Sequence, residues 1–379
     1  MKTRSWVAVS AAALLLAGCA SPAPEPSATT LPPVTPTPSA TPDPLAGLTV
    51  EQRVGQVFMV GTTASAAEAA TLEAVRDRFV GGVFLSGRSN AGTTATAGVV
   101  AQFTAAASPD RPLFVATDQE GGQVQVLSGP GFSEMPSALD QGATDAASLQ
   151  ASATTWAREL ASAGVNMNLA PVVDLIASRE AAASNPPIGG YDREFAFDAE
   201  GIVSHADAFR AGMTAGGVTS VIKHFPGLGA VTANTDDTAG VTDTTTNAQS
   251  DSVGIYRSEI ASGADTIMMS SAIYAQIDSK APAVFSPTVV TGLLRDGLEF
   301  DGVIITDDLS GATQVAAWSP ADRAILAIEA GCDIVLVSRT PTVAAEMIDA
   351  VVAKAQSDPA FAELVDAAAR RVLASKTAD

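Results

Sequence analysis

Eight short apolar runs alternate with longer alanine-rich segments along this chain, and this alternation constrains its fold more than any other feature. The runs are rich in Val, Ile, Phe and Met, and they lie at Gly55–Gly61, Val80–Leu85, Pro112–Asp118, Val165–Pro171, Val218–His224, Thr266–Ile273, Gly302–Asp307 and Cys332–Val337. Segments of helical character lie between them, among others at Ser65–Arg78, Ala146–Ala163, Asp198–Ala215 and Thr342–Ala355. Such alternation predicts a parallel sheet with both faces covered.

Eight strand–helix units over roughly 330 residues predict an α/β chain that folds as a single (β/α)8 TIM-like barrel. The barrel domain is expected over residues 45–379, with no second linker inside it. Hydrophobic residues make up 47% of the chain, which is enough for a sizeable core. A doubly wound open sheet is the alternative, because periodicity alone does not count strands securely.

The N-terminus has the pattern of an export signal. Lys2 and Arg4 precede an apolar stretch over residues 7–17 that is too short for a good membrane span. Residues 16–19, Leu-Ala-Gly-Cys, resemble the bacterial lipobox, which predicts a lipoprotein signal peptide over residues 1–18 and lipidation of Cys19. An ordinary signal peptide with a chance cysteine is the alternative.

Residues 19–44 form a Pro/Ser/Thr-rich linker with nine prolines. A segment of this composition cannot bury enough apolar surface to fold, so we expect a disordered tether. Together with a lipid on Cys19, the tether would hold the barrel at the extracytoplasmic face of the cell membrane.

The charge and the counts of reactive residues exclude several classes of function. A net charge of −20 repels phosphate backbones, so nucleic acid is not expected as a partner. With only two Cys and two His, no Cys/His zinc cluster or H-E-x-x-H motif can form, and no G-x-S-x-G motif occurs. Neither a metal nor a cofactor is expected. Cys332 is interpreted as a buried small hydrophobe. His205 is interpreted as a residue that either supports the structure or faces solvent.

Polar side chains close most of the predicted strands. They are Asp118, Asn168 with Asp174 beyond it, Lys223 with His224, Ser270 with Ser271, and Asp307 with Asp308. Barrel active sites lie at the carboxyl ends of the strands. Carboxylates beside a Lys-His pair are suited to holding hydroxyl groups and stabilising a cationic transition state, as in glycosidases.

Several sequence motifs point to a particular protein family. They read Asp-Gln-Glu-Gly-Gly at 118–122, Asn-Leu-Ala-Pro-Val-Val-Asp at 168–174, Tyr-Asp-Arg-Glu-Phe at 191–195, Lys-His-Phe-Pro-Gly at 223–227 and Ile-Ile-Thr-Asp-Asp-Leu-Ser at 304–310. Over about residues 46–375 the chain resembles family 3 glycoside hydrolases, most closely the single-domain bacterial β-N-acetylglucosaminidases (β-hexosaminidases) of cell-wall turnover.

The resemblance implies roles for five residues. Asp307 matches the nucleophile that forms a covalent glycosyl-enzyme, and a carboxylate at a strand end is suited to that chemistry. The alternative for Asp307 is a helix N-cap, a role that Asp308 could fill instead. Asp118, Arg193, Lys223 and His224 match residues that hold the sugar hydroxyls. The alternative for His224 is a buried structural histidine.

The chain departs from the family at the acid/base. The family's Asp-x-His dyad falls on Asn234 and Asp236, so the histidine is missing. Asp236, or its neighbour Asp237, can replace it, since a carboxylic acid is the commoner acid/base in glycosidases. The alternatives are a weakened catalyst and a plain solvated turn over residues 234–238. Carboxylates here would repel phosphate, which favours hydrolysis over phosphorolysis.

Two further departures concern charged or ionisable contacts. Gln123 and Val126 stand where the family commonly has two arginines, and Ser270-Ser271 replaces an Ala-His pair. Aromatic residues make up only 5% of the chain, which favours a pocket for one terminal sugar over a long polysaccharide platform.

The predicted function is that of a retaining exo-β-N-acetylglucosaminidase, which hydrolyses terminal N-acetylglucosamine from cell-wall (peptidoglycan) fragments through a glycosyl-Asp intermediate. A β-glucosidase or other β-glycosidase of the same family is one alternative. A non-catalytic sugar- or muropeptide-binding lipoprotein is the other. The expected partners are a carbohydrate substrate and, through the lipid, a membrane, and the expected state is a monomer.

Overall fold

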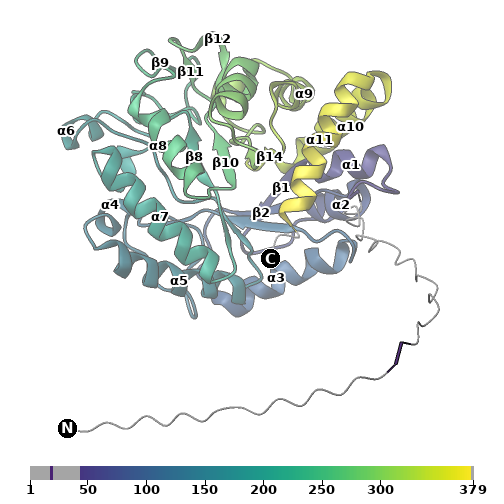
Figure 1. Ribbon diagram of the computed structural model, residues 1–379, viewed down its shortest axis with the longest axis horizontal. Coiled ribbons are helices and arrows are strands. Elements are labelled where there is room, and N and C mark those ends of the chain that lie inside the picture. Colours follow the sequence, from purple (N-terminus) through teal and green to yellow (C-terminus); the bar gives the residue numbers. More distant parts are fainter. Residues whose placement is uncertain (1–17, 20–42, 377–379) are drawn as a thin grey trace. The chain divides into compact units, whose positions relative to one another are not determined.

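Parallel strands at the centre of the molecule form a closed ring (Figure 1). In chain order they are β1 (Phe58–Thr63), β2 (Gly82–Ser86), β3 (Phe114–Thr117), β6 (Met167–Asn168), β7 (Thr219–Ser220), β8 (Ile222–Phe225), β10 (Thr266–Met269), β13 (Val303–Ile305) and β14 (Val335–Val337). One series of pairs runs β14-β1-β2-β3-β6-β7 and another runs β8-β10-β13. Val221 alone separates β7 from β8, and a parallel bridge from Ile305 to Ile334 joins β13 to β14. The ring is therefore a TIM-like barrel rather than an open sheet.

This computed structural model describes residues 18–19 and 43–376, and its folded unit begins at Asp43. The predicted signal peptide and tether lie outside the described residues, except for residues 18–19 and 43–44. Cys19 itself is exposed. Within the described ranges, no helix is both long enough and apolar enough to cross a membrane.

Helices surround the barrel (Figure 1). The longer ones are α1 (Val50–Gln56), α2 (Ala69–Arg78), α3 (Gly92–Ala106), α5 (Ala146–Ser162), α7 (Ala199–Ala215), α8 (Asp251–Ala261), the π-helical η3 (Thr288–Gly297), α9 (Pro320–Ala330), α10 (Ala344–Ser357) and α11 (Pro359–Ser375). Short ones are α4 (Ala138–Gln141), α6 (Arg179–Ala182), η1 (Gly189–Tyr191), η2 (Ala283–Phe285), η4 (Thr313–Val315) and η5 (Pro341–Val343).

The helix boundaries follow local capping signals. Asp145 caps α5 by accepting from the Ser148 N–H, and Asp198 caps α7 in the same way from Gly201. Both helices therefore match their predictions to within a residue. The first strand starts three residues later than predicted, because residues 50–56 form α1 behind the Thr49 capping box.

The core has two layers, one inside the barrel and one between the barrel and its helices. In β1, Met59 joins the inner cluster, whereas its neighbours Phe58 and Val60 join the outer one. Strands buried on both faces explain the nearly continuous apolar runs. Cys332 is buried, as predicted, and its Sγ lies 3.8 Å from the Val284 carbonyl oxygen. His205 contacts two backbone carbonyls, which confirms its structural role.

Short antiparallel pieces in the loops were not predicted from the sequence. One is a hairpin of β4 (Gln119–Gly121) and β5 (Val124–Gln125), and the other joins β12 (Asp278–Pro282) to β11 (Ile273–Tyr274), which pairs with β9 (Thr242–Asp243). Strands this short show no readable period. Gly121 has φ +108°, and a Cβ there would lie 2.0 Å from the Pro136 carbonyl oxygen, so this turn requires glycine.

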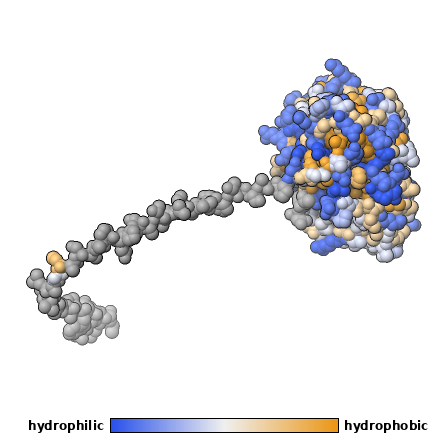
Figure 2. Space-filling model, turned by 90° about the vertical axis from the view of Figure 1, so that its right-hand side faces the viewer, coloured by the Kyte–Doolittle hydropathy of each residue, from blue (hydrophilic) through white to orange (hydrophobic). Residues whose placement is uncertain are grey.

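The face of the molecule seen in Figure 2 mixes hydrophilic and hydrophobic residues over the folded body. Among the residues that the structure describes, the exposed large hydrophobic side chains are those of Tyr191 and Leu364. Single exposed apolar residues are normal on a soluble surface, and Leu364 needs no further explanation.

Candidate active site

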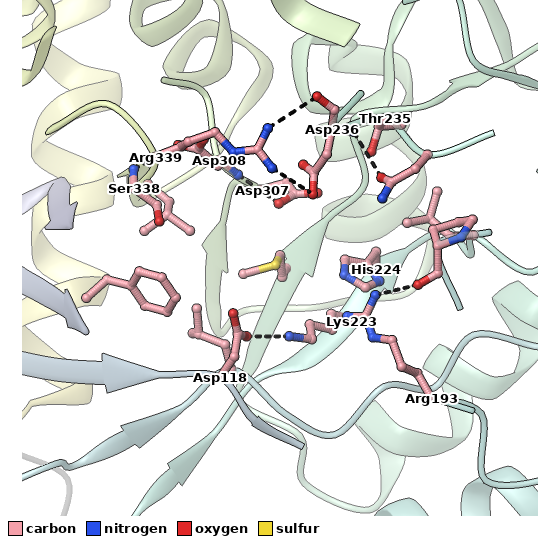
Figure 3. A pocket seen from close by; sticks show the side chains of 17 residues that line it. Asp118, Arg193, Lys223, His224, Thr235, Asp236, Asp307, Asp308, Ser338 and Arg339 are labelled. Atoms are coloured by element: carbon pink, nitrogen blue, oxygen red, sulfur yellow. Dashed lines mark hydrogen bonds and ion pairs between the residues drawn. The ribbon is translucent and has the colours of Figure 1, made fainter. Parts of the chain in front are cut away.

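A cavity of about 200 Å³ opens at the carboxyl ends of the barrel strands (Figure 3). The six site residues predicted from the sequence all line it, and they are Asp118, Arg193, Lys223, His224, Asp236 and Asp307. They come from strand ends and loops far apart in the chain. The barrel brings them together because the ends of parallel strands meet on one face.

One residue, the buried Thr306, separates Asp307 from the end of β13. One of its oxygens, Oδ1, accepts a hydrogen bond of 2.8 Å from the Asp308 backbone N–H. Burial raises the pKa of Asp307 to about 6, with Asp236 adding to this rise while His224 opposes it. A carboxylate that points into a cavity and makes few hydrogen bonds is suited to nucleophilic attack.

Asp308 has a different role. It accepts hydrogen bonds from the Ser310 N–H and hydroxyl, from the Gly311 N–H and from the Ser338 N–H. It therefore stabilises the turn after β13 and ties it to the end of β14, with no helix to cap at this point.

A network of buried charges holds the cavity floor. Lys223 Nζ lies 2.6 Å from both Asp118 Oδ1 and Glu120 Oε1, and Arg193 makes two 2.8 Å hydrogen bonds to Glu120. Burial alone would raise the pKa of Glu120, but Arg193 and Lys223 outweigh it and lower the pKa to about 2. Burial likewise opposes the charge of Lys223, yet Asp118 and Glu120 raise the Lys223 pKa overall. These charges are fixed in place before a ligand binds.

His224 is oriented by Asp174. Its Nδ1 lies 2.7 Å from Asp174 Oδ2, and its backbone N–H donates to Asp174 Oδ1 at 3.2 Å. The Leu228 N–H also donates to Oδ1, at 2.7 Å, so the carboxylate holds both the ring and the following turn. With Nδ1 engaged, the other ring nitrogen is left for the cavity.

Asp236 lies on the loop between β8 and β9. Its backbone N–H donates to the Asn234 side chain at 3.0 Å, while the Thr313 N–H donates to its carbonyl at 3.0 Å. The predicted turn therefore exists, but it is fastened to η4. Asp236 lines the cavity, whereas the side chain of Asp237 is 74% exposed. Burial raises the pKa of Asp236, with Arg339 opposing the rise and Asp308 adding to it.

Three contributors were given no role by sequence reasoning, although Asp174 was among the polar residues found near strand ends. Glu120 and Asp174 stood inside quoted motifs, but nothing in the spacing showed which partners they would contact. Arg339 lines the cavity just after β14, so the strand-end rule applied to the eighth strand would have found it. Val126 and Ser270 stand at positions where the chain departs from the family pattern. Val126 is buried, and the Ser270 hydroxyl accepts a hydrogen bond from the Tyr274 hydroxyl at 2.9 Å. Within the described residues, no group of His, Cys, Asp or Glu is arranged to hold a metal ion.

Comparison with known proteins agrees with this geometry. The model of the glycosyl hydrolase family 3 N-terminal domain matches residues 49–375. A β-hexosaminidase of Stenotrophomonas maltophilia is 32% identical over 303 residues, which cover 78% of this chain and 87% of the relative. The match covers most of both chains, so it is not confined to one motif.

Solved structures give the same result. The crystal structure of a β-N-acetylhexosaminidase from Beutenbergia cavernae is 64% identical with a TM-score of 0.87, covering 88% of this chain and 100% of that one. A family 3 β-N-acetylglucosaminidase from Paenibacillus is 30% identical with a TM-score of 0.80, covering 87% and 62%. The chain therefore belongs to glycosyl hydrolase family 3, and it is a glycosidase.

Proposed function

We propose that this glycosidase is a retaining exo-β-N-acetylglucosaminidase that removes terminal N-acetylglucosamine from cell-wall fragments. The observation that carries the proposal is that Asp307 and Asp236 line one cavity together with Asp118, Arg193, Lys223 and His224, whose side chains are suited to binding hydroxyl groups. The names of the similar β-hexosaminidases support the preference for an N-acetylated sugar.

In the proposed reaction, Asp307 attacks the anomeric carbon and forms a C–O bond while the glycosidic C–O bond breaks. The leaving oxygen takes the proton of Asp236. Asp236 then removes a proton from water, whose oxygen attacks the same carbon and releases the Asp307 carboxylate. Asp307 must therefore start ionised and Asp236 protonated.

The binding groups suit one neutral sugar ring. Lys223 and Arg193 offer hydrogen-bond donors, while Asp118 and the Nε2 of His224 offer acceptors. A cavity of about 200 Å³ lies below the range of ~300–1,000 Å³ that is typical of drug-sized ligands. It therefore fits removal of a single terminal unit better than the binding of a long chain.

Water is the proposed acceptor. Asp236, Asp237 and Asp308 give the cavity mouth negative charge, which repels phosphate. Adding inorganic phosphate to the assay should leave the rate unchanged and yield no sugar phosphate. A phosphate-dependent rate would instead indicate phosphorolysis.

Trapping tests the nucleophile. A 2-deoxy-2-fluoroglucosyl donor, in which fluorine takes the place of the 2-acetamido group, should inactivate the enzyme and label the peptide that contains Asp307. Asp307→Ala should be neither labelled nor active. Label on another carboxylate would refute the assignment. A panel of nitrophenyl β-glycosides distinguishes this sugar preference from a β-glucosidase, and binding without turnover on every member would indicate a sugar-binding protein.

A second kinetic test addresses Asp236. Asp236→Asn should lose most of its kcat/KM on a substrate with a poor leaving group and retain kcat/KM on a dinitrophenyl glycoside, which needs no proton to leave. Its kcat on the dinitrophenyl glycoside should still fall, because the base that activates water is missing. Azide should restore turnover with a β-glycosyl azide product. Asp237→Asn is the matched control and should turn over both substrates without azide.

We also propose that Cys19 carries a lipid that anchors the enzyme outside the cytoplasm. The lipobox-like residues before Cys19 and the exposure of Cys19 support this. Growth with labelled palmitate should label the wild type but not Cys19→Ala. A wild-type protein that takes up no label would contradict the proposal.

A further inference from the structure

Arg339 connects the end of β14 with the loop that carries Asp236 (Figure 3). Its Nη2 lies 3.6 Å from Asp236 Oδ2, and its Nη1 lies 3.9 Å from Asp237 Oδ1. The same Nη1 donates to the Asp236 backbone carbonyl at 3.4 Å. One guanidinium therefore contacts the loop through a main-chain oxygen and through two carboxylates.

The Arg339 stem is itself held in place. A Cβ on Gly311 would come within 2.6 Å of both Cβ and Cδ of Arg339, so the arginine lies flat against this glycine. Gly311 belongs to the turn that Asp308 stabilises. The turn that follows the nucleophile therefore positions the aliphatic stem of Arg339.

The charges around Asp236 explain why a cation is needed there. Asp237 faces it from its own loop, Asp307 and Asp308 face it from the end of β13, and His224 faces it from β8. Three of these four neighbours are carboxylates. Arg339, from the end of β14, is the cation in direct contact with Asp236 among the described residues.

We propose that Arg339 is a positioning residue that holds the Asp236 loop over the cavity and stabilises the carboxylate form of Asp236. This inference rests on the acid/base role proposed above for Asp236. In the second half of the reaction Asp236 must be ionised to take a proton from water, and a neighbouring guanidinium favours that form. Arg339 therefore matters most after the glycosyl-enzyme has formed.

The direction of the effect follows from the charge. Without Arg339, Asp236 holds its proton to higher pH. The basic limb of kcat/KM, where Asp236 loses the proton that it donates, should move to higher pH. The acidic limb of glycosyl-enzyme hydrolysis, where Asp236 becomes protonated and no longer acts as a base, should also move to higher pH. The side chains of Arg339 and Asp236 are 52% and 40% exposed, so solvent weakens the pair and the expected shift is about half a pH unit.

The experiment compares Arg339→Gln, Arg339→Lys and a control, Arg370→Gln. Arg370 forms an exposed ion pair with Asp43 and does not line the cavity. The readouts are the kcat/KM pH profile and the pH dependence of reactivation of the 2-fluoro-trapped enzyme. Arg339→Gln should move both limbs to higher pH and slow reactivation about threefold on the acidic limb, less so in 1 M salt. Arg339→Lys keeps the positive charge, so its limbs should lie close to those of wild type. Arg370→Gln should match wild type.

Two outcomes would overturn the inference. A lower kcat with unmoved limbs would mean that Arg339 only supports the fold of the loop, and unchanged kinetics would mean that it has no role. Neither outcome affects the proposed function, because labelling of Asp307 reports on that separately. If Asp307 is not labelled in wild type, the proposed function fails instead, whatever Arg339→Gln does.

Discussion

Asp174 and His224 form a buried pair in which the Oδ2 of the carboxylate lies 2.7 Å from the Nδ1 of the ring. The carboxylate is fully buried and the histidine is 5% exposed. Because a carboxylate only accepts, the proton of the ring sits on Nδ1, and Nε2 faces the cavity. Asp174 thus decides what His224 can offer to a sugar hydroxyl.

Replacing Asp174 by Asn should therefore change which nitrogen of the His224 ring carries the proton. The new amide can offer its N–H to Nδ1, which moves the ring proton to Nε2. We expect kcat/KM to fall by about tenfold to a hundredfold, because a small misplacement of a positioning group is costly. Steady-state kinetics with the matched Asp237→Asn control measure this. Wild-type kcat/KM in Asp174→Asn would contradict the orienting role.

Glu120→Gln should destabilise the fold in a pH-dependent way. Burial opposes the charge, but Arg193 and Lys223 lower the Glu120 pKa from 4.5 to about 2. A depressed pKa contributes stability above the unfolded value of 4.5, and this is lost as the pH falls toward 2. The variant should lose about 3 kcal/mol of unfolding free energy at pH 7, and the difference from wild type should shrink below pH 4.5.

Urea unfolding at pH 7, 5, 4 and 3 checks the Glu120 prediction. Asp43→Asn, at an exposed ion pair, is the control and should change stability by less than about 1 kcal/mol. A difference between Glu120→Gln and wild type that stays constant with pH would show that lost packing, and not the charge, causes the effect.

The pH profile of wild-type kcat/KM should fall on its acidic side near pH 6. Burial raises the pKa of Asp307 to about 6, and below that pH the nucleophile is protonated. Asp236 adds to this rise, so Asp236→Asn should move the acidic limb to lower pH. A dinitrophenyl glycoside as substrate keeps the measurement independent of acid catalysis. An acidic limb near pH 4 in wild type would refute the raised pKa.

Asp307→Asn should be inactive and more stable than wild type at neutral pH. A raised pKa means that folding disfavours the charged form, so the ionised Asp307 costs stability above pH 6, and this cost vanishes as the pH falls to 3.8. We expect a gain of about 2 kcal/mol at pH 7, discounted because the cavity admits solvent. Denaturant unfolding at pH 7 and pH 3.5 measures it, and equal gains at both values would contradict the electrostatic cause.

The strand ends show how far the sequence alone reaches. Asp118, Lys223, His224 and Asp307 each follow an apolar run, and in a parallel barrel such positions meet on one face. The same reasoning located the eight strands to within a few residues, because strands buried on both faces leave runs that can be read locally. The alternation with alanine-rich segments located α5 and α7 as well, and the structure shows that Asp145 and Asp198 cap them.

The choice between Asp236 and Asp237 was decided only by the tertiary structure. The two residues are adjacent and chemically identical, and local turn propensity fits both. Hydrogen bonds from η4, more than seventy residues away, fix which one faces the cavity. Tertiary structure alone also decides three further contacts, which are those of Glu120 with Arg193, of Asp174 with His224 and of Arg339 with Asp236. Local sequence determines which residues close a strand, but distances between loops depend on the packing of the whole barrel, which no local pattern encodes.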